Sequence, residues 1–155
     1  MEFDEENDMH FGEEDCLEDA QAKANSTKEL IEFFNMHSQI CIEKLEEQMY
    51  TIASLYDYAA EQVGAAYKEA LEAKRLKEYR YAILDKSIRS DRAKVTVSEL
   101  DSLIKVDPRY QEAVSNYNEA EGNRIMLNSK LQALQMKKDM LQILGSARKR
   151  ERDKI

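Results

Sequence analysis

The sequence predicts an all-α fold in which two long helices, with a short helix between them, pack as coiled coils. First, the 155 residues include only four Gly and one Pro, so few residues favour turns. Second, charged residues make up 35 % of the chain, a composition typical of long helices. Third, apolar residues alternate at intervals of three and four, which is the signature of coiled-coil packing.

The acidity of the chain is concentrated at its beginning. Residues 1–20 contain ten carboxylates and no Lys or Arg, so the net charge of −8 conceals a body with a net charge of +2. A block of like charge cannot bury enough apolar surface to offset its ordering entropy. We therefore expect residues 1–22 to form a disordered acidic tail. Its role stays open between a docking peptide for a basic partner, a pseudo-substrate for the protein's own basic surface, and a solubilising tail.

The first long helix is predicted over residues 27–86. Ser26-Thr27-Lys28-Glu29 matches a capping box, and no strong helix breaker follows until about residue 87. Such a helix would be roughly 90 Å long at 1.5 Å per residue, too long for one chain of this size to bury alone. Its apolar seam is therefore expected to join copies of the chain into a homo-oligomer. The seam consists of Ile42, Leu45, Met49, Ile52, Tyr56, Ala59, Val63, Ala66, Ala70 and Ala73.

A basic cluster begins where this heptad seam ends. The next register positions are Lys77 and Arg80, and the apolar stripe is expected to step back one residue, to Leu76, Tyr79 and Ile83. Lys and Arg can contact phosphates while an aromatic ring stacks on a base, a combination suited to single strands. The alternative is an ordinary solvated helix face with Tyr79 in the core. The candidate nucleic-acid-binding residues are Lys74, Arg75, Lys77, Tyr79, Arg80, Lys86, Arg89, Arg92 and Lys94.

The sequence marks the starts of two further helices after a break at residues 87–96. Thr96-Val97-Ser98-Glu99 is a second capping box, opening a short helix that ends near Lys105. Asp107-Pro108 places an N-cap before a proline at the first position of the last long helix. That helix is expected to end near Leu144 with Gly145 as its C-cap, which completes a helical domain over residues 23–145. Residues 146–155 are expected to be a frayed basic C-terminus.

The last helix also carries an apolar stripe. Arg124 and Lys138 fall on stripe positions, which suggests a wet or register-setting patch. The stripe consists of Tyr110, Val114, Tyr117, Ala120, Leu127, Leu131, Leu134 and Leu141, of which the four leucines are further candidates for oligomerisation.

No pattern of catalytic residues is present. The four glycines form no phosphate-binding loop, and neither His10 nor His37 lies in a nucleophile motif. Cys16 and Cys41 form no metal motif and no disulfide framework, which fits a reducing cytoplasm. No hydrophobic run approaches the ~20 residues of a membrane span. We expect a non-enzyme without metal, cofactor, small-molecule substrate or membrane partner.

Three segments carry a family resemblance: KVTVSELDSLIKVDPRY, residues 94–110, STKELIEFFN, residues 26–35, and Arg75-Leu76 with Lys74 and Tyr79. Together they resemble the phage UvsY-type recombination mediators, over roughly residues 26–140. The first segment resembles a short segment before the family's last helix. STKELIEFFN resembles the start of its long helix, and Arg75-Leu76 with Lys74 and Tyr79 resembles a basic-aromatic patch near that helix's end. The acidic tail and Pro108 depart from the family's pattern. The matching positions in the first two segments are Lys94, Ser98, Leu103, Lys105, Val106 and Asp107, and Ser26, Thr27, Lys28, Glu32 and Asn35.

The resemblance implies a ring-forming, all-helical homo-oligomer that binds single-stranded DNA. Such a mediator helps a RecA-like recombinase replace the single-strand-binding protein, without covalent chemistry or a cofactor. The implied partners are single-stranded DNA, further copies of the chain, the recombinase and the single-strand-binding protein, in the cytoplasm of an infected bacterial host.

Two other functions remain open from the sequence. One is a coiled-coil scaffold or assembly protein that binds only proteins and uses the basic cluster as a salt-bridged face. The other is a phage inhibitor of a host factor, whose acidic tail would imitate nucleic acid.

Overall fold

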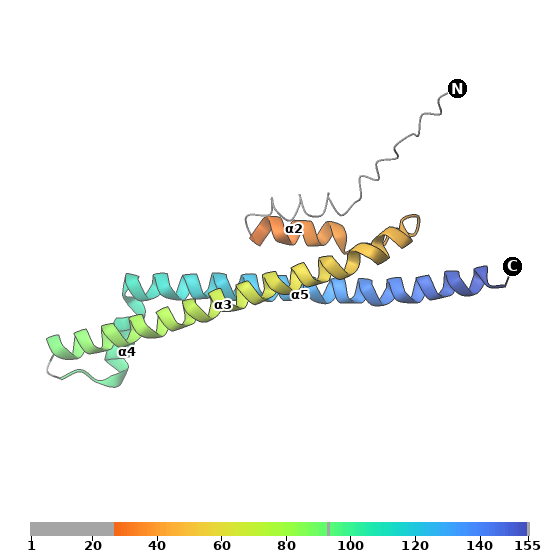
Figure 1. Ribbon diagram of the computed structural model, residues 1–155. Coiled ribbons are helices and arrows are strands. Elements are labelled where there is room, and N and C mark those ends of the chain that lie inside the picture. The colour runs from red at the N-terminus through yellow and green to blue at the C-terminus, as the bar shows by residue number, and fades with distance from the viewer. Residues whose placement is uncertain (1–26, 93, 155) are drawn as a thin grey trace, which may run out of the picture. The chain divides into compact units, whose positions relative to one another are not determined.

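The computed structural model describes residues 27–92 and 94–154, and within these ranges the chain forms four helices and no strand. They are α2 (Thr27–His37), α3 (Leu45–Asp91), α4 (Val97–Val106) and α5 (Pro108–Arg152) (Figure 1). The predicted all-α fold class is confirmed. The predicted disordered tail, residues 1–22, lies outside the described residues.

The predicted continuous helix over residues 27–86 is wrong, because residues 38–44 separate α2 from α3. Side chains satisfy the backbone of this connection. The Ser38 hydroxyl donates to the Asn35 carbonyl, and the Gln48 amide binds both backbone groups of Cys41, with its Nε2 donating to the carbonyl at 2.8 Å. Such local bonds compete with helical ones and stabilise the break. Ile42, the first position of the predicted seam, lies in this connection and is 66 % exposed.

The chain divides into two compact units, and α3 and α5 each contribute to both. Unit 1 comprises Met1–Asp57 and Gln132–Ile155, and unit 2 comprises Tyr58–Leu131. Within each unit, the segments of α3 and α5 run antiparallel. In unit 1 Met49 lies against Gly145 and Tyr56 lies near Lys138, while in unit 2 Lys77 lies over Tyr117 and Tyr81 meets Tyr110.

Unit 1 packs α2 together with the first turns of α3 and the last turns of α5. The rings of Phe33 and Phe34 meet edge to face at 5.5 Å, and Phe33 also contacts the His37 ring. The core side chains are large, which suits three helices meeting at one point. They are Leu30, Phe33 and Phe34 of α2, Leu45, Ile52 and Leu55 of α3, and Leu134 and Leu141 of α5.

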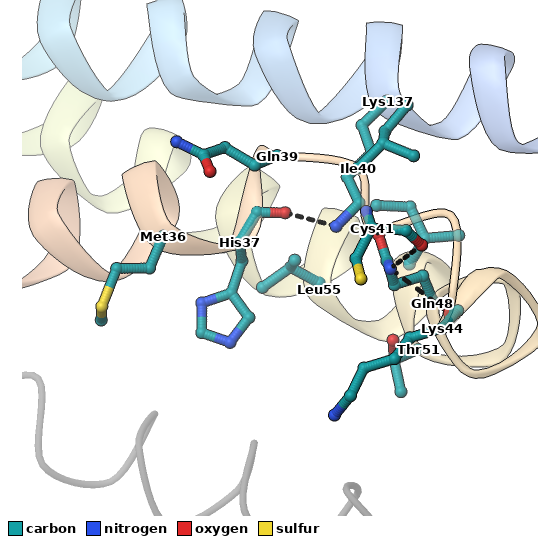
Figure 2. Close-up of a pocket in the computed structure, with 11 residues that line it drawn as sticks. Met36, His37, Gln39, Ile40, Cys41, Lys44, Gln48, Thr51, Leu55 and Lys137 are labelled. Carbon is teal, nitrogen blue, oxygen red and sulfur yellow. Dashed lines mark hydrogen bonds between the residues drawn. The ribbon is translucent and has the colours of Figure 1, made fainter.

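Lys137 of α5 joins this core although it is charged, and its side chain is only 7 % exposed. Its Nζ donates to the backbone carbonyl of His37 at 2.6 Å, as the dashed line in Figure 2 shows. His37 is the last residue of α2, so the ammonium group faces the negative end of that helix. Arg148 donates similarly to the Ile42 carbonyl at 3.2 Å. These two cations of α5 hold the segment that follows α2, while burial lowers the pKa of Lys137 below its usual value.

Unit 2 packs α4 against α3 and α5 around a core that includes many alanines. Leu100 and Ile104 of α4 form a cluster with Leu84 of α3, bordered by Tyr81 and Tyr110 among others. Small side chains on both long helices allow them to approach closely. The other buried members are Ala59, Ala66 and Ala70 of α3, and Ala113, Ala120 and Leu127 of α5.

The predicted starts of the last two helices are confirmed. The Thr96 side chain accepts from the Glu99 amide at 3.3 Å, so it caps α4. The Asp107 carboxylate accepts from the Arg109 amide at 2.9 Å, directly before Pro108 opens α5. The reciprocal bond of this second capping box does not form, because the Glu99 carboxylate pairs with Arg92.

The path of the buried seam along α3 differs from the prediction. Leu76, Tyr79 and Ile83 are exposed, so the predicted backward step is wrong. The seam instead moves forward from Ala73, with two successive intervals of four residues, a stutter in the heptad pattern. The physical reason is α4, whose Leu100 and Ile104 offer apolar partners on that side. The seam there consists of Lys77, Tyr81, Leu84 and Ile88.

The end of α5 also corrects the prediction. Gly145 is not a C-cap, because α5 continues through Arg152 and includes much of the segment predicted to fray. A Cβ at position 145 would lie 2.7 Å from the Met49 Cε atom, so the glycine makes room for that side chain. Ala113 is buried in place of the predicted Val114, which is half-buried.

The two charged stripe positions are half-buried and have partners. The Arg124 guanidinium binds Glu121 at 2.6 Å, and the Lys138 Nζ lies 5.2 Å from the centre of the Tyr56 ring. Both polar groups are therefore accommodated at the edges of the seam.

Most of the predicted oligomerisation residues are covered by the chain itself. This contradicts the argument that one chain could not bury the seam, and it leaves oligomerisation as a proposal. Tyr56, Val63 and Leu131 are half-buried, and Met49 is exposed with Ile42. The buried members are Leu45, Ile52, Ala59, Ala66, Leu127, Leu134 and Leu141.

Replacement of Ile104 by Ala should lower the free energy of unfolding by about 2–5 kcal/mol, because the side chain is fully buried between α3 and α5 in unit 2. Val106→Ala, two residues along the same helix at an exposed position, should change it by less than about 0.5 kcal/mol. Urea unfolding followed by circular dichroism measures both. Equal effects of the two substitutions would contradict the packing of α4.

Replacement of Gly122 by Ala should raise the free energy of unfolding by about 0.5–1 kcal/mol, because a helical Cβ there meets nothing within 4 Å. Gly145→Ala should gain less, since the Met49 side chain must move. When Met49 is replaced by Ala, Gly145→Ala should raise the free energy of unfolding by as much as Gly122→Ala does. Unfolding of the unaltered protein, the Met49→Ala and Gly145→Ala variants and the double variant forms a double-mutant cycle, and an unchanged gain at Gly145 in both backgrounds would rule out the contact.

Candidate nucleic-acid interface on α3

The predicted nucleic-acid-binding residues lie in unit 2, on the last part of α3 and the connection that follows it. They do not share one face. With about 3.6 residues per turn, positions 74 to 92 distribute around the whole helix, and Lys77 even falls on the buried seam. The structure therefore separates the predicted patch into cations that already have partners and cations that do not.

One face of α3 carries Arg75, Tyr79 and Lys86, at intervals of four and seven residues that place them in one row. We call these three residues the outward row. Tyr79 is 62 % exposed, so the alternative that placed it in the core is wrong. Arg75 and Lys86 are exposed, and neither has an ion-pair partner within the described parts of the chain. The outward row thus offers a free ring between two uncompensated cations.

Two more predicted residues are also exposed and without an ion-pair partner among residues 27–92 and 94–154. Arg80 lies on the flank of the outward row, and Lys94 lies in the connection to α4. Both add positive potential near the row, although neither shares its face.

The remaining four cations have partners within unit 2. Lys77 lies over the Tyr117 ring, with its Nζ 4.1 Å from the ring centre. The Arg89 guanidinium binds Asp85 at 3.0 Å, and Arg92 binds Glu99 at 3.4 Å.

Lys74 forms no ion pair in the described ranges, but its charge acts on the Glu121 carboxylate of α5. The pKa of Glu121 is lowered, first by a hydrogen bond from Arg124, and the charges of Arg124 and Lys74 lower it further. The negative charge of Glu121 therefore partly compensates the positive charge of Lys74. The sequence count of eight basic residues overstates the charge that a polyanion would meet.

Tyr81 differs from Tyr79 although only Arg80 separates them. Its hydroxyl donates to the Asp101 carboxylate at 3.3 Å, and its ring meets the Tyr110 ring edge to face at 5.7 Å. Burial raises the pKa of Tyr81 above its usual value, and the negative charge of Asp101 raises it further. Tyr81 therefore orients α4 on α3, which leaves Tyr79 as the aromatic residue that can bind a ligand.

Sequence reasoning missed the exposed apolar residues beside the row. Leu76 and Ile83 were assigned to the buried stripe, but both face solvent next to Tyr79. The intervals of three and four residues among Leu76, Tyr79 and Ile83 correctly indicated that these residues share one face of the helix. The sequence did not reveal that this face is the open one.

Other chemistry finds little support in residues 27–92 and 94–154. No group of three or more His, Cys, Asp or Glu side chains there is arranged to hold a metal ion. A pocket of about 460 Å³ in unit 1 contains Cys41, Lys44 and Lys137, but the His37 carbonyl already binds the Lys137 ammonium (Figure 2). None of the helices in the described ranges is both long and apolar enough to cross a membrane.

Comparison of the chain with protein-family models, with curated proteins and with solved structures finds no match.

Limited nitration with tetranitromethane should modify Tyr79 faster than Tyr81, because the exposed Tyr79 ring is accessible to the reagent. Tyr81 is half-buried and its raised pKa disfavours the phenolate. Trypsin cleaves after Arg80 and separates the two tyrosines, so mass spectrometry can follow both. In urea the two rates should converge. Equal rates in the folded protein would contradict the different environments of the two rings.

Proposed function

We propose that this chain binds single-stranded DNA through α3 and acts as a recombination mediator, loading a RecA-like recombinase in place of single-strand-binding protein. The outward row is the observation that supports DNA binding. Arg75 and Lys86 are separated by roughly 16 Å along the helix at 1.5 Å per residue, with the exposed Tyr79 ring between them. This spacing lets phosphates meet the cations while a base stacks on the ring.

The proposed binding mode favours single strands without regard to sequence. Every base has a flat face that can stack on Tyr79, and stacking requires a base that is not paired within a duplex. Exposed Leu76 and Ile83 extend the apolar surface on which a base can rest. Binding by one row is weak, so several copies must act together to hold a strand. The mediator role, which comes from the family resemblance, then requires only differences in affinity among proteins that compete for that strand.

We further propose that copies of the chain meet through a second apolar stripe, because the first seam is used within the chain. In unit 1, α5 exposes Met136, Met140, Ile143 and Ala147 at intervals of four, three and four residues. This spacing is the one that coiled-coil pairing requires. A ring or smaller oligomer built in this way leaves the outward row free.

A coiled-coil scaffold that binds only proteins is the second candidate function. The ion pairs of Arg89 and Arg92 favour it, because they are what a solvated, salt-bridged helix face contains. The binding experiment that follows separates the two functions.

Replacement of both Arg75 and Lys86 by Ala should weaken binding to a labelled single-stranded oligonucleotide and reduce the slope of log K against log salt by about 1.4, at roughly 0.7 per lost phosphate contact. Tyr79→Ala should cost about 1–3 kcal/mol of binding free energy without changing that slope. Fluorescence anisotropy at several salt concentrations measures both.

The matched control is the double variant Arg89→Ala and Arg92→Ala, which removes two cations that already have carboxylate partners. It should weaken binding less than the first pair. Equal effects of the two pairs would reject the outward row, and an unaltered protein that shows no salt-sensitive binding would favour the scaffold.

A further inference from the structure

A groove of about 470 Å³ lies in unit 1, between the first turns of α3 and the last turns of α5. Met49 and Tyr50 contribute exposed apolar surface, and Gly145 lets the Met49 side chain lie against the α5 backbone. Lys149 and Arg152 form part of its wall. Glu46 is the one carboxylate among the lining residues, against the three cations Arg148, Lys149 and Arg152, so the groove combines an apolar floor with a mainly basic edge.

The basic edge belongs to a wider positive surface at the end of α5. Residues 148–154 hold five basic and two acidic side chains. Lys149, Arg150 and Arg152 have no ion-pair partner in the ranges that the structure describes. Cations in a last turn also stabilise the helix dipole, which accounts for their presence there. It does not account for the exposed Tyr50 beside them, which is 81 % accessible.

We propose that the acidic N-terminal segment of the same chain, residues 1–26, docks in this groove. Its ten carboxylates complement Lys149 and Arg152, and Phe3 and Phe11, which interrupt the acids, match the apolar floor. A ligand for this groove needs both kinds of group, because charge alone would leave Met49 and Tyr50 exposed.

The position of the segment in the chain makes this docking intramolecular. Residues 1–26 directly precede α2, which belongs to the same unit as the groove. The 15 residues between Phe11 and α2 reach at most roughly 50 Å when fully extended. The effective concentration of the segment near the groove is then of the order of millimolar, so even weak contacts suffice. At micromolar protein concentration a second copy that is not associated with the first cannot compete with it.

The proposed docking does not rest on DNA binding by α3, but it affects which positive surface of the chain a nucleic acid can reach. With the segment bound, the basic end of α5 is already neutralised, and a nucleic acid meets the outward row as the main free positive surface. The segment acts as a built-in counterion that only a stronger polyanion displaces.

A photo-crosslinker on Cys16 tests the proposal in the full chain. Cys41 is exposed and is first replaced by Ser, so that a benzophenone maleimide labels Cys16 alone. After irradiation, mass spectrometry should find cross-links at Met49, Tyr50 and the α5 peptide around Gly145. Met36, a methionine of unit 1 that is also exposed and lies outside both the groove and the proposed contact between copies, controls for the preference of benzophenone for methionine. Equal cross-linking to Met36 and Met49 would overturn the proposal.

A matched pair of double variants identifies the charges that hold the segment. Lys149→Glu with Arg152→Glu should lower the yield of cross-links in the groove several-fold. Lys68→Glu with Lys130→Glu, an equal change of charge in unit 2, should leave the yield unchanged. Circular dichroism checks that both remain helical. If the first variant does not fold, raising the salt concentration with the unaltered groove should reduce the yield, and a yield independent of salt would overturn the proposal.

Mixing distinguishes docking within a chain from docking on a second copy. The labelled chain is combined with an isotopically heavy chain that carries Cys16→Ser and Cys41→Ser. Cross-links confined to the light chain support intramolecular docking. Cross-links that reach the heavy chain in proportion to its amount would overturn it in favour of a second copy.

Discussion

The burial of one side of α5 at every seventh residue is the constraint on which the rest of the structure depends. Ala113, Ala120, Leu127, Leu134 and Leu141 are all buried, and in each unit a segment of α3 covers them. A helix that gives one stripe to the core leaves its other faces to solvent. Because α3 turns its own seam toward α5, the outward row is left on the open side of α3. The candidate interface is thus a consequence of how the core is built.

The sequence predicted those parts of the fold that local chemistry determines. Heptad spacing indicated the long helices, and Thr96 and Asp107 marked two helix starts, because a cap requires only neighbouring residues. The break at residues 38–44 could not be predicted in the same way. It is held partly by Lys137, which reaches the His37 carbonyl from 100 residues along the chain. The direction of the stutter in α3 likewise depends on contacts with α4. The spacing of residues within α3 gives no information about where α4 lies.

The candidate site shows the same division between local and distant causes. The concentration of positive charge near residues 74–94 was visible in the sequence, and the pairing of Arg89 with Asp85 could have been found there, since the two are four residues apart on a helix. The partners of Lys77 and Arg92 belong to α5 and α4. The exposure of Tyr79 depends on which side of α3 packs against the other helices. Charge was therefore predictable from the sequence, whereas the availability of that charge was not.

Availability, rather than net charge, decides whether an acidic chain can bind a polyanion. At physiological salt, charges more than about 8 Å apart in solvent are largely screened from one another, so a contact depends mainly on the charges near it. Only uncompensated cations release the counterions of a phosphate they meet. Arg75, Arg80, Lys86 and Lys94 are such cations in unit 2, and four contacts correspond to a salt slope of about −2.8 for single strands. The net charge of −8 does not exclude that slope, because residues 1–20 contribute −10 and the rest of the chain carries a net charge of +2.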